Sequence, residues 1–484
     1  MGMNMVNNEH LLKYDKSEIN YSGTLYYLVK DTVSLKKYLV VKGDTTGFQG
    51  EINSADGCLY CPLMPENARL LRHRIPWLSP SPIGLRPSAG MGDRLGLATP
   101  GHIRAVKDTP FIPVFAQQSV RENARTGRSP QMVLDEAMWG IFEEGWTQNW
   151  GADADHLKNT EDLLSFIRAG FTFFTIDPGE HVDNAAQTDP VVVLREKVEA
   201  LPWDILQSNP VDLIDTYLNK AISLDGVTLQ LSETNLLRAL AKYGKAIAHT
   251  KNMYQYLLSH IGSRTFDLEV SVDETELPTS VEEHYFISSE LTRLKISWVS
   301  MAPKFVGRFE KGVDYIGDMD VFRAELKKHT AVQHHFGNYK LSLHSGSDKF
   351  SIYKLAAEYA KGKIHLKTAG TSYLEALRVI AKVNPGLFKD ILQLGINRYS
   401  IDSASYHVSA KLEKVPAFAQ MEEAHLADLL DHFDARQVLH VTYGSALAQY
   451  GKLIKQSLLQ NEKDYYEGLR VHFKNHLNPL LAGC

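Results

Sequence analysis

The feature that most constrains the fold of this chain is a repeated order of short apolar strand, polar turn and longer amphipathic helix. This alternation is typical of parallel sheets covered by helices, and it fits a βα barrel with insertions best. We find nine candidate strands, one more than an eight-stranded barrel needs. They are a segment near Ile83 and residues 111–116, 149–153, 171–176, 266–270, 295–299, 340–343, 364–367 and 438–442.

The chain divides into two parts near residue 80. Residues 1–79 contain short apolar runs without a chemical motif and predict a small N-terminal α+β region. The Ser-Pro-Ser-Pro segment at 79–82 then marks a boundary, because proline-rich segments interrupt regular structure. We expect residues 80–484 to form a (β/α)8 TIM-type barrel that carries the active site. Within it, residues from about 191 to 256 predict a helical insertion between two strands.

Composition excludes several classes of function. With 484 residues, 44% hydrophobic and 23% charged, the chain can bury a full core. A net charge of -5 without clustered Lys and Arg argues against nucleic-acid binding. No segment approaches the roughly 20 apolar residues of a membrane helix, and the N-terminus lacks a basic segment followed by an apolar one. We therefore expect a cytoplasmic protein with neither nucleic acid nor membrane as a partner.

Polar groups recur at the carboxyl ends of the predicted strands. His344 follows the strand at 340–343 and opens the turn Ser-Gly-Ser-Asp, in which Asp348 is a candidate substrate contact. Each such group, taken singly, is adequately explained as a satisfied polar residue. Their recurrence favours a site, because the carboxyl ends of barrel strands open on one face. The other clusters lie at 151–156, 176–181, 269–274 and 309–315.

The residue types in these clusters indicate a metal site. They combine His, Asp and Glu without Cys, which is the ligand set of Mn²⁺, Co²⁺, Ni²⁺ or Zn²⁺. We therefore expect a divalent cation as the cofactor. The turn at 344–348 also offers hydroxyls and a carboxylate, which suit a sugar or sugar acid as the small-molecule substrate. A homo-oligomer is compatible with these features.

Several longer segments resemble the tagaturonate epimerase family, including its relatives that act on fructose and tagatose. The resemblance extends from about Gly84 to Leu477, whereas residues 1 to about 80 match poorly. It implies a metal-dependent enzyme that interconverts tagaturonate and fructuronate by inverting C4. The segments are Gly-Ala-Asp-Ala-Asp-His at 151–156, Glu-Val-Ser-Val-Asp-Glu-Thr-Glu at 269–276, Phe-Glu-Lys-Gly-Val-Asp-Tyr at 309–315, Ser-Leu-His-Ser-Gly-Ser-Asp-Lys-Phe at 342–350 and Lys-Thr-Ala-Gly-Thr-Ser-Tyr-Leu-Glu-Ala at 367–376.

The resemblance also implies roles for individual residues. Asp155 corresponds to the proton acceptor and Glu269 to the proton donor. His156 and His344 correspond to metal ligands, and a further acidic ligand is assigned to Glu310. In addition, His440 is a spare candidate for the metal or for a substrate hydroxyl.

Inversion at C4 of a 2-keto sugar can follow two routes, because the C4 proton is not adjacent to the carbonyl. A retro-aldol route breaks the C3–C4 bond, whereas a carbonyl-shift route first makes C4 acidic. Both use Asp155, Glu269 and the metal, and we favour the retro-aldol route slightly. A proton donor such as Glu269 requires a pKa raised by burial or by a carboxylate such as Asp273.

Two other classes of function remain open on the sequence. A metal-dependent aldose–ketose isomerase would use the same barrel and ligands, and it would differ by chemistry at C1 and C2. A non-catalytic sugar-binding protein would bind sugar equally well after metal removal. The sequence does not decide between a uronate and a neutral ketohexose as the substrate.

Overall fold

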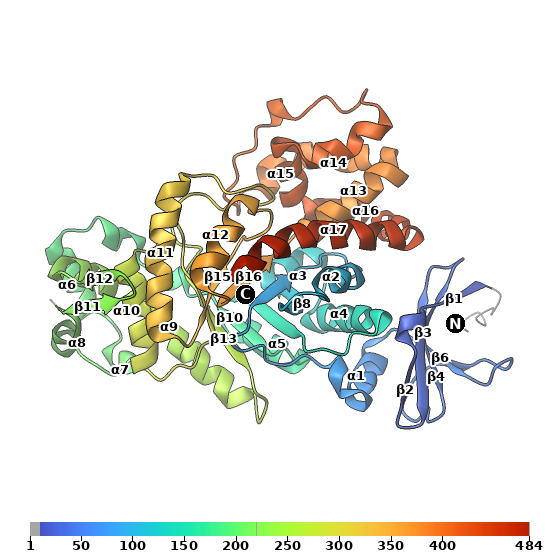
Figure 1. The fold of residues 1–484 in the computed structure, drawn as a ribbon, viewed down its shortest axis with the longest axis horizontal. Helices are drawn as coiled ribbons and strands as arrows, with labels where there is room; N and C mark the ends of the chain where they lie inside the picture. Colours follow the sequence, from blue (N-terminus) through green and yellow to red (C-terminus); the bar gives the residue numbers. More distant parts are fainter. Residues whose placement is uncertain (1–9, 219, 484) are drawn as a thin grey trace.

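A closed barrel of eight parallel strands forms the centre of the computed structural model, which describes residues 10–218 and 220–483 (Figure 1). Strands that are consecutive in this part of the chain are neighbours around the barrel. The strands are β7 (Ser88–Met91), β8 (Ile112–Ser119), β9 (Gly151–Leu157), β10 (Phe173–Ile176), β13 (Asp267–Ser271), β14 (Ser300–Ala302), β15 (Lys340–Leu343) and β16 (Ile364–Thr368). The predicted (β/α)8 architecture is thereby confirmed.

Helices follow each strand and cover the outside of the barrel. Their ends carry local signals: Ser280 and Glu283 form a capping box at the start of α10 (Val281–Arg293), and Gly170 follows α5 (Thr160–Ala169) in the left-handed conformation. The helices that follow barrel strands directly are α2 (Thr99–Val106), α3 (Val120–Thr126), α4 (Pro130–Glu144), α5 (Thr160–Ala169), α10 (Val281–Arg293), α11 (Met319–Phe336), α12 (Phe350–Ala360) and α13 (Thr371–Val383).

Two additions to the barrel lie at opposite ends of the molecule (Figure 1). One is an antiparallel sheet at the N-terminal end of the described chain, and the other is inserted between β10 and β13. The sheet contains β1 (Leu11–Lys13), β2 (Ile19–Tyr21), β3 (Thr24–Asp31), β4 (Lys37–Lys42), β5 (Glu51–Ile52) and β6 (Leu59–Pro62), followed by α1 (Pro65–Arg74). The insertion contains α6 (Val191–Glu199), α7 (Trp203–Leu206), α8 (Pro210–Tyr217), the hairpin of β11 (Ala221–Leu224) and β12 (Val227–Gln230), and α9 (Glu233–His260).

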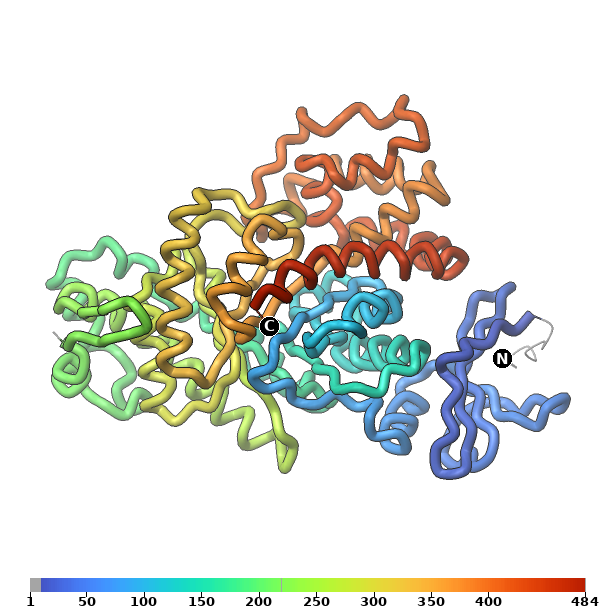
Figure 2. The backbone as a smooth tube through the Cα atoms, in the orientation of Figure 1, coloured from blue at the N-terminus to red at the C-terminus, as the bar shows by residue number. Residues whose placement is uncertain are grey.

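A helical layer after β16 lies against one side of the barrel. Its last long helix, α17, packs on α2, α12 and α13, and brings the C-terminal end of the chain back beside the barrel (Figure 2). Besides α13, the layer contains α14 (Pro385–Asp402), α15 (Phe433–Val441), α16 (Tyr443–Gln460) and α17 (Glu462–Leu480).

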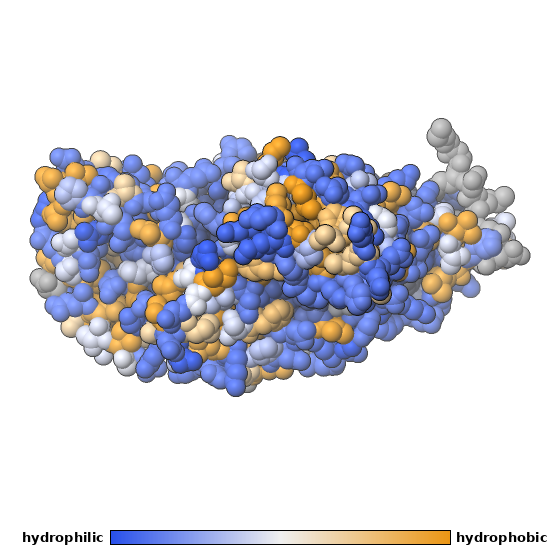
Figure 3. All heavy atoms as spheres, turned by 90° about the horizontal axis from the view of Figure 1, so that it is seen from above, coloured by the Kyte–Doolittle hydropathy of each residue, from blue (hydrophilic) through white to orange (hydrophobic). Residues whose placement is uncertain are grey.

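Most of the face seen in Figure 3 is hydrophilic, with apolar residues in separate groups. Between residues 10 and 483, with residue 219 left aside, no helix has both the length and the apolar character needed to cross a membrane.

The strand predicted at 438–442 is wrong, because these residues belong to α15 and the short segment after it. All residues of this helix from Asp434 to Val441 are buried, its polar side chains included, so the short segment at 438–442 carries no sign of an exposed helix face. A short apolar run without a polar face cannot be distinguished from a buried strand by periodicity alone. Two other strands are displaced from their predicted places: β14 begins just after 295–299, and β7 lies a few residues after Ile83.

Candidate active site

The interior of the barrel combines an apolar cluster with buried ionisable groups, among them Lys340 and Asp267 at the first residues of β15 and β13. A small cluster of Ile83, Ile112, Val114 and Phe173 forms an apolar layer beside the first residues of the strands. Toward the carboxyl ends of the strands, further ionisable side chains are buried. Branched apolar side chains dominate most TIM barrels, so this charged interior requires a functional reason.

Lys367 is the centre of this charged interior. It lies on β16, and its Nζ reaches across the barrel to Asp153 Oδ2 (2.7 Å) and Asp155 Oδ1 (2.7 Å) on β9 and to Glu269 Oε1 (2.8 Å) on β13. It also donates a hydrogen bond to Thr175 Oγ1 (2.6 Å). All these side chains are buried, and buried charges persist only when paired and hydrogen-bonded. One ammonium group is therefore the shared ion-pair partner of three carboxylates.

The two aspartates of this network have pKa values that are shifted in opposite directions. Burial raises the pKa of Asp153 to about 7 against the opposing effect of Lys367. Burial also disfavours ionisation of Asp155, but Lys367, His156 and His344 outweigh it and hold the pKa of that carboxyl well below its usual value. Asp155 Oδ2 additionally accepts a hydrogen bond from Gln117 Nε2 (3.1 Å). Asp155 is therefore an ionised carboxylate, as a proton acceptor must be.

A β-bulge explains how two consecutive residues reach the same site. Ala154 pairs with Phe174 and Leu157 with Ile176, so two residues of β9, Asp155 and His156, stand opposite one residue of β10. Side chains on a regular strand alternate between the two faces, and one of this pair would point out of the barrel. The bulge re-aims the side chain, and His156 takes a left-handed backbone conformation with φ of 52°. Such a conformation is uncommon outside glycine and occurs often at functional sites.

His156 and His344 meet above the Lys367 network. Their ring centroids are 5.0 Å apart, and together with Asp155 they form a group whose potential ligand atoms lie within 4.8 Å of one another. Burial disfavours the charged form of His156, but the Asp155 carboxylate and a hydrogen bond with Asp177 raise its pKa to about 10. The Nδ1 atom of His156 lies 3.1 Å from Asp177 Oδ2.

His344 lies between two carboxylates. Its Nε2 is 2.6 Å from Glu269 Oε1, and its Nδ1 is 3.2 Å from Asp273 Oδ1. Burial opposes protonation of His344, but Asp273 and Glu269 raise its pKa to about 9 despite Lys367. The pKa of Glu269 is lowered, not raised, because Lys367 and His344 outweigh burial. Asp273 does not act as the carboxylate neighbour that would keep Glu269 protonated, since it binds His344 and Ser271 instead.

A cavity of about 470 Å³ opens onto His344 and Asp273 at the barrel mouth. Glu310 lines this cavity, but the structure does not bring it into the group of Asp155, His156 and His344. Its Oε2 accepts hydrogen bonds from Ser409 Oγ (2.7 Å) and Gln437 Nε2 (2.9 Å). The cavity is lined by Arg121, Asp273, Glu274, Glu276, Pro278, Pro303, Lys304, Phe305, Gly307, Arg308, Phe309, Glu310, Lys311, His344, Ser345 and residues 405–409.

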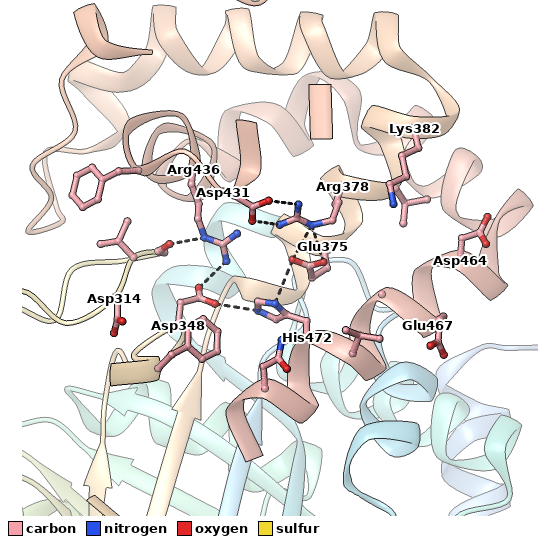
Figure 4. Close-up of a pocket in the computed structure, with 18 of the residues that line it drawn as sticks. Asp314, Asp348, Glu375, Arg378, Lys382, Asp431, Arg436, Asp464, Glu467 and His472 are labelled. Atoms are coloured by element: carbon pink, nitrogen blue, oxygen red, sulfur yellow. Dashed lines mark hydrogen bonds and ion pairs between the residues drawn. The ribbon is translucent and has the colours of Figure 1, made fainter. Parts of the chain in front are cut away.

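Asp348 lies apart from the cavity at the barrel mouth, in a larger cavity of about 880 Å³ within the helical layer (Figure 4). Its carboxylate pairs with Arg436 (2.9 Å) and His472 (3.1 Å), and its backbone N–H donates to His476 Nε2 (3.0 Å). Arg436 and His472 outweigh burial and hold the pKa of Asp348 well below its usual value. These contacts occupy Asp348 and join the turn after β15 to α15 and α17. Asp348 therefore lies outside the group of Asp155, His156 and His344 and lines the second cavity instead.

His440 is not among the residues that line the cavity at the barrel mouth. The predicted strand that carried it is the helix α15, and its imidazole is fully buried beside the loops at Gly312 and Gly370. Its Nε2 faces the carbonyl oxygen of Ala369 (3.3 Å). Burial and the charge of Arg94 lower its pKa well below the usual value. Neither the group with His156 and His344 nor the lining of the cavity at the barrel mouth includes it.

Sequence reasoning did not assign roles to Asp153, Asp177 or Lys367, although each lies at or near a strand end in the quoted clusters. The signal was present, because a lysine between apolar residues of a buried strand needs a counter-charge. Which carboxylates supply it depends on strands more than 90 residues away, since Asp153 and Glu269 are remote from Lys367 in the chain.

Comparison with known proteins supports the resemblance seen in the sequence and extends it into the N-terminal sheet. A family model described as tagaturonate epimerase matches residues 14–480. A tagaturonate/fructuronate epimerase of Thermotoga maritima is 43% identical over 474 residues, which cover 96% of each chain. Two crystal structures of fructuronate-tagaturonate epimerase UxaE from Cohnella laeviribosi, one native and one with a glycerol, are each 37% identical. They cover 97% of this chain and 96% of their own, with TM-scores of 0.91 and 0.92. The chain belongs to the tagaturonate epimerase family.

Proposed function

We propose that this chain is a divalent-metal-dependent epimerase that interconverts tagaturonate and fructuronate by inverting C4. Family membership supports the reaction, and one observation supports the chemistry. Asp155, His156 and His344 converge at the barrel mouth, with Glu269 in contact with His344. An ionised carboxylate, a second carboxylate and a set of metal ligands are what either route to C4 inversion requires.

The residues present fit a divalent cation. His156 and His344 would supply two imidazole nitrogens, and the Asp155 carboxylate lies in the same group, beside the cation that they would hold. With both histidines neutral, as metal ligands are, the charge around them is negative, because the carboxylates of Asp153, Asp155, Glu269, Asp177 and Asp273 outnumber the ammonium groups of Lys367 and Lys158. In addition, Glu269 Oε2 is buried and has no hydrogen-bond partner within the described residues. When bound, such a cation would polarise the C2 carbonyl of the sugar.

Asp155 and Glu269 would carry the protons. In the retro-aldol route, Asp155 accepts the O4 proton as the C3–C4 bond breaks, and the electron pair of that bond is delocalised toward the C2 carbonyl. The aldehyde at C4 rotates, the bond re-forms on its other face, and the new C4 alkoxide takes a proton from Glu269. Because Glu269 is ionised in the free enzyme, it must take up a proton before it can donate one.

The test is incubation with tagaturonate, with and without Mn²⁺, while the products are followed by ¹³C NMR. Formation of fructuronate that depends on Mn²⁺ is expected. An aldose product would show a C1–C2 isomerase, and binding without turnover would show a sugar-binding protein. In D₂O, the retro-aldol route leaves no deuterium at C4, whereas the carbonyl-shift route introduces it when the proton carriers exchange with solvent.

A further inference from the structure

One ammonium group in the cavity at the barrel mouth has no counter-charge and, among the described residues, a single hydroxyl as its hydrogen-bond partner. Lys311 lies on the loop between β14 and α11, and its Nζ donates a hydrogen bond to Ser345 Oγ (2.8 Å). Within the described part of the chain, no Asp or Glu lies at ion-pair distance from it. The adjacent carboxylate of Glu310 is turned away, toward Ser409 and Gln437. The cavity therefore contains a positive charge that a ligand can neutralise.

The two arginines that line this cavity pair with carboxylates, and its other lysine, Lys304, donates to two backbone carbonyl oxygens, those of Thr275 and Glu276. Arg121 pairs with Glu274 (3.3 Å), Arg308 pairs with Glu310 (3.4 Å), and Lys304 Nζ donates to the carbonyl oxygen of Glu276 (3.1 Å). An anionic ligand that used any of these groups would have to displace an existing contact. Lys311 can bind an anion by giving up no more than a hydrogen bond to a hydroxyl.

The backbone on both sides of Lys311 is held in place. Lys349 is fully buried, and its Nζ donates hydrogen bonds to the carbonyl oxygens of Glu310 (2.8 Å) and Val313 (2.5 Å). On the other side of the contact, Ser345 directly follows His344 and has a left-handed backbone with φ of 49°. Groups fixed in this way before the ligand arrives lose little entropy on binding.

We propose that Lys311 and Ser345 bind the carboxylate end of a hexuronate and thereby set a preference for a sugar acid over a neutral ketohexose. The inference rests on the function proposed above. A carboxylate accepts charge-assisted hydrogen bonds, which are about twice as strong as those between neutral groups. A neutral ketohexose presents a hydroxymethyl group at the same end. Because Ser345 adjoins His344, a sugar anchored here extends from the proposed metal ligands.

The experiment compares Lys311→Met, Lys311→Arg and wild-type enzyme on tagaturonate and on tagatose in the presence of Mn²⁺. Lys311→Met should lower kcat/KM for tagaturonate by about 10- to 100-fold, mainly through KM, as expected for a lost hydrogen bond to a charged group. It should change kcat/KM for tagatose by less than about 3-fold. Lys311→Arg should restore most of the loss. Lys304→Met serves as a control lysine of the same cavity and should affect both sugars alike.

Ionic strength provides a readout that needs no turnover of tagatose. The KM of the wild type for tagaturonate should rise with NaCl, because salt screens the ammonium–carboxylate attraction, and that of Lys311→Met should stay constant. Equal losses on both sugars, or an unchanged salt dependence in Lys311→Met, would overturn the inference while leaving the epimerase intact. A wild type that converts neither sugar would instead refute the proposed function.

Discussion

Replacing Lys367 by Met should leave buried carboxylates in the barrel without their positive partner. The free energy of unfolding of this variant should then depend on pH by an amount that can be calculated. The substitution leaves Asp153, Asp155 and Glu269 buried around the position of the lost ammonium group. Removing one partner of a buried ion pair costs about 3–5 kcal/mol. The folded variant can limit this cost by taking up one proton. Protonating a carboxyl of ordinary pKa near 4 costs about 5 kcal/mol at pH 7.5 and about 2 kcal/mol at pH 5.5.

The direction of the pH effect follows from proton linkage. Between pH 5.5 and 7.5 the unfolded chain has ionised carboxylates, and the folded wild type already takes up a proton as Asp153 titrates near pH 7. The folded variant is expected to hold one proton more than the folded wild type over this range. Its stability relative to wild type should therefore increase by about 1.4 kcal/mol for each unit that the pH falls. Urea unfolding of both proteins without metal, followed by circular dichroism at pH 5.5, 6.5 and 7.5, measures this difference.

Two further variants separate charge from packing. Adding Asp153→Asn to Lys367→Met removes one carboxylate and should recover stability at pH 7.5 while flattening the pH dependence. Lys340→Met removes another buried lysine of the barrel, whose Nζ donates to Ser88 Oγ (2.8 Å) and to the carbonyl oxygen of Arg86 (3.2 Å). That control should show no comparable pH dependence. A loss in Lys367→Met that is below about 1 kcal/mol, or equal at all three pH values, would refute the charge-balance reasoning.

Three other predictions concern the site and the acid stability of the fold. Asp155→Asn should lower kcat for tagaturonate by about 10² or more with little change in KM; steady-state kinetics showing a change in KM alone would make Asp155 a binding group. Chelation should abolish turnover and Mn²⁺ should restore it, whereas His344→Ala should retain no stoichiometric Mn²⁺ by elemental analysis; full metal content in that variant would contradict the ligand assignment. Burial lowers the pKa of His102 to about 4, so the folded state resists a proton that the unfolded chain accepts below about pH 6.5. Stability should fall by about 3 kcal/mol between pH 6.5 and 4 from this residue, and His102→Gln should reduce the slope of the unfolding midpoint against pH; an unchanged slope would count against it.

The strand and helix pattern and the positions of the polar clusters could be predicted from the sequence alone, because both depend on local order. A buried strand needs a run of apolar residues, and a barrel places the residue after each strand on one face. This reasoning placed His156, His344 and Glu269 at strand ends, and the structure brings them together. It failed at 438–442, because the short run Val-Leu-His-Val-Thr has the composition of a buried strand, and a run of this length does not distinguish a strand from part of a buried helix.

The tertiary structure alone decided which charges meet and in which state they are held. The bulge that turns both Asp155 and His156 toward the site is visible only in the pairing of β9 with β10. The low pKa of Glu269 arises from Lys367 and His344, which are far from it in the sequence. Glu310 and Asp348 have polar neighbours similar to those of the site residues in the sequence. In the structure, Gln437 holds Glu310 at the wall of the barrel-mouth cavity, and Arg436 holds Asp348 in the second cavity. Ionisation depends on burial and on charges across the barrel, and neither is a property of a local segment.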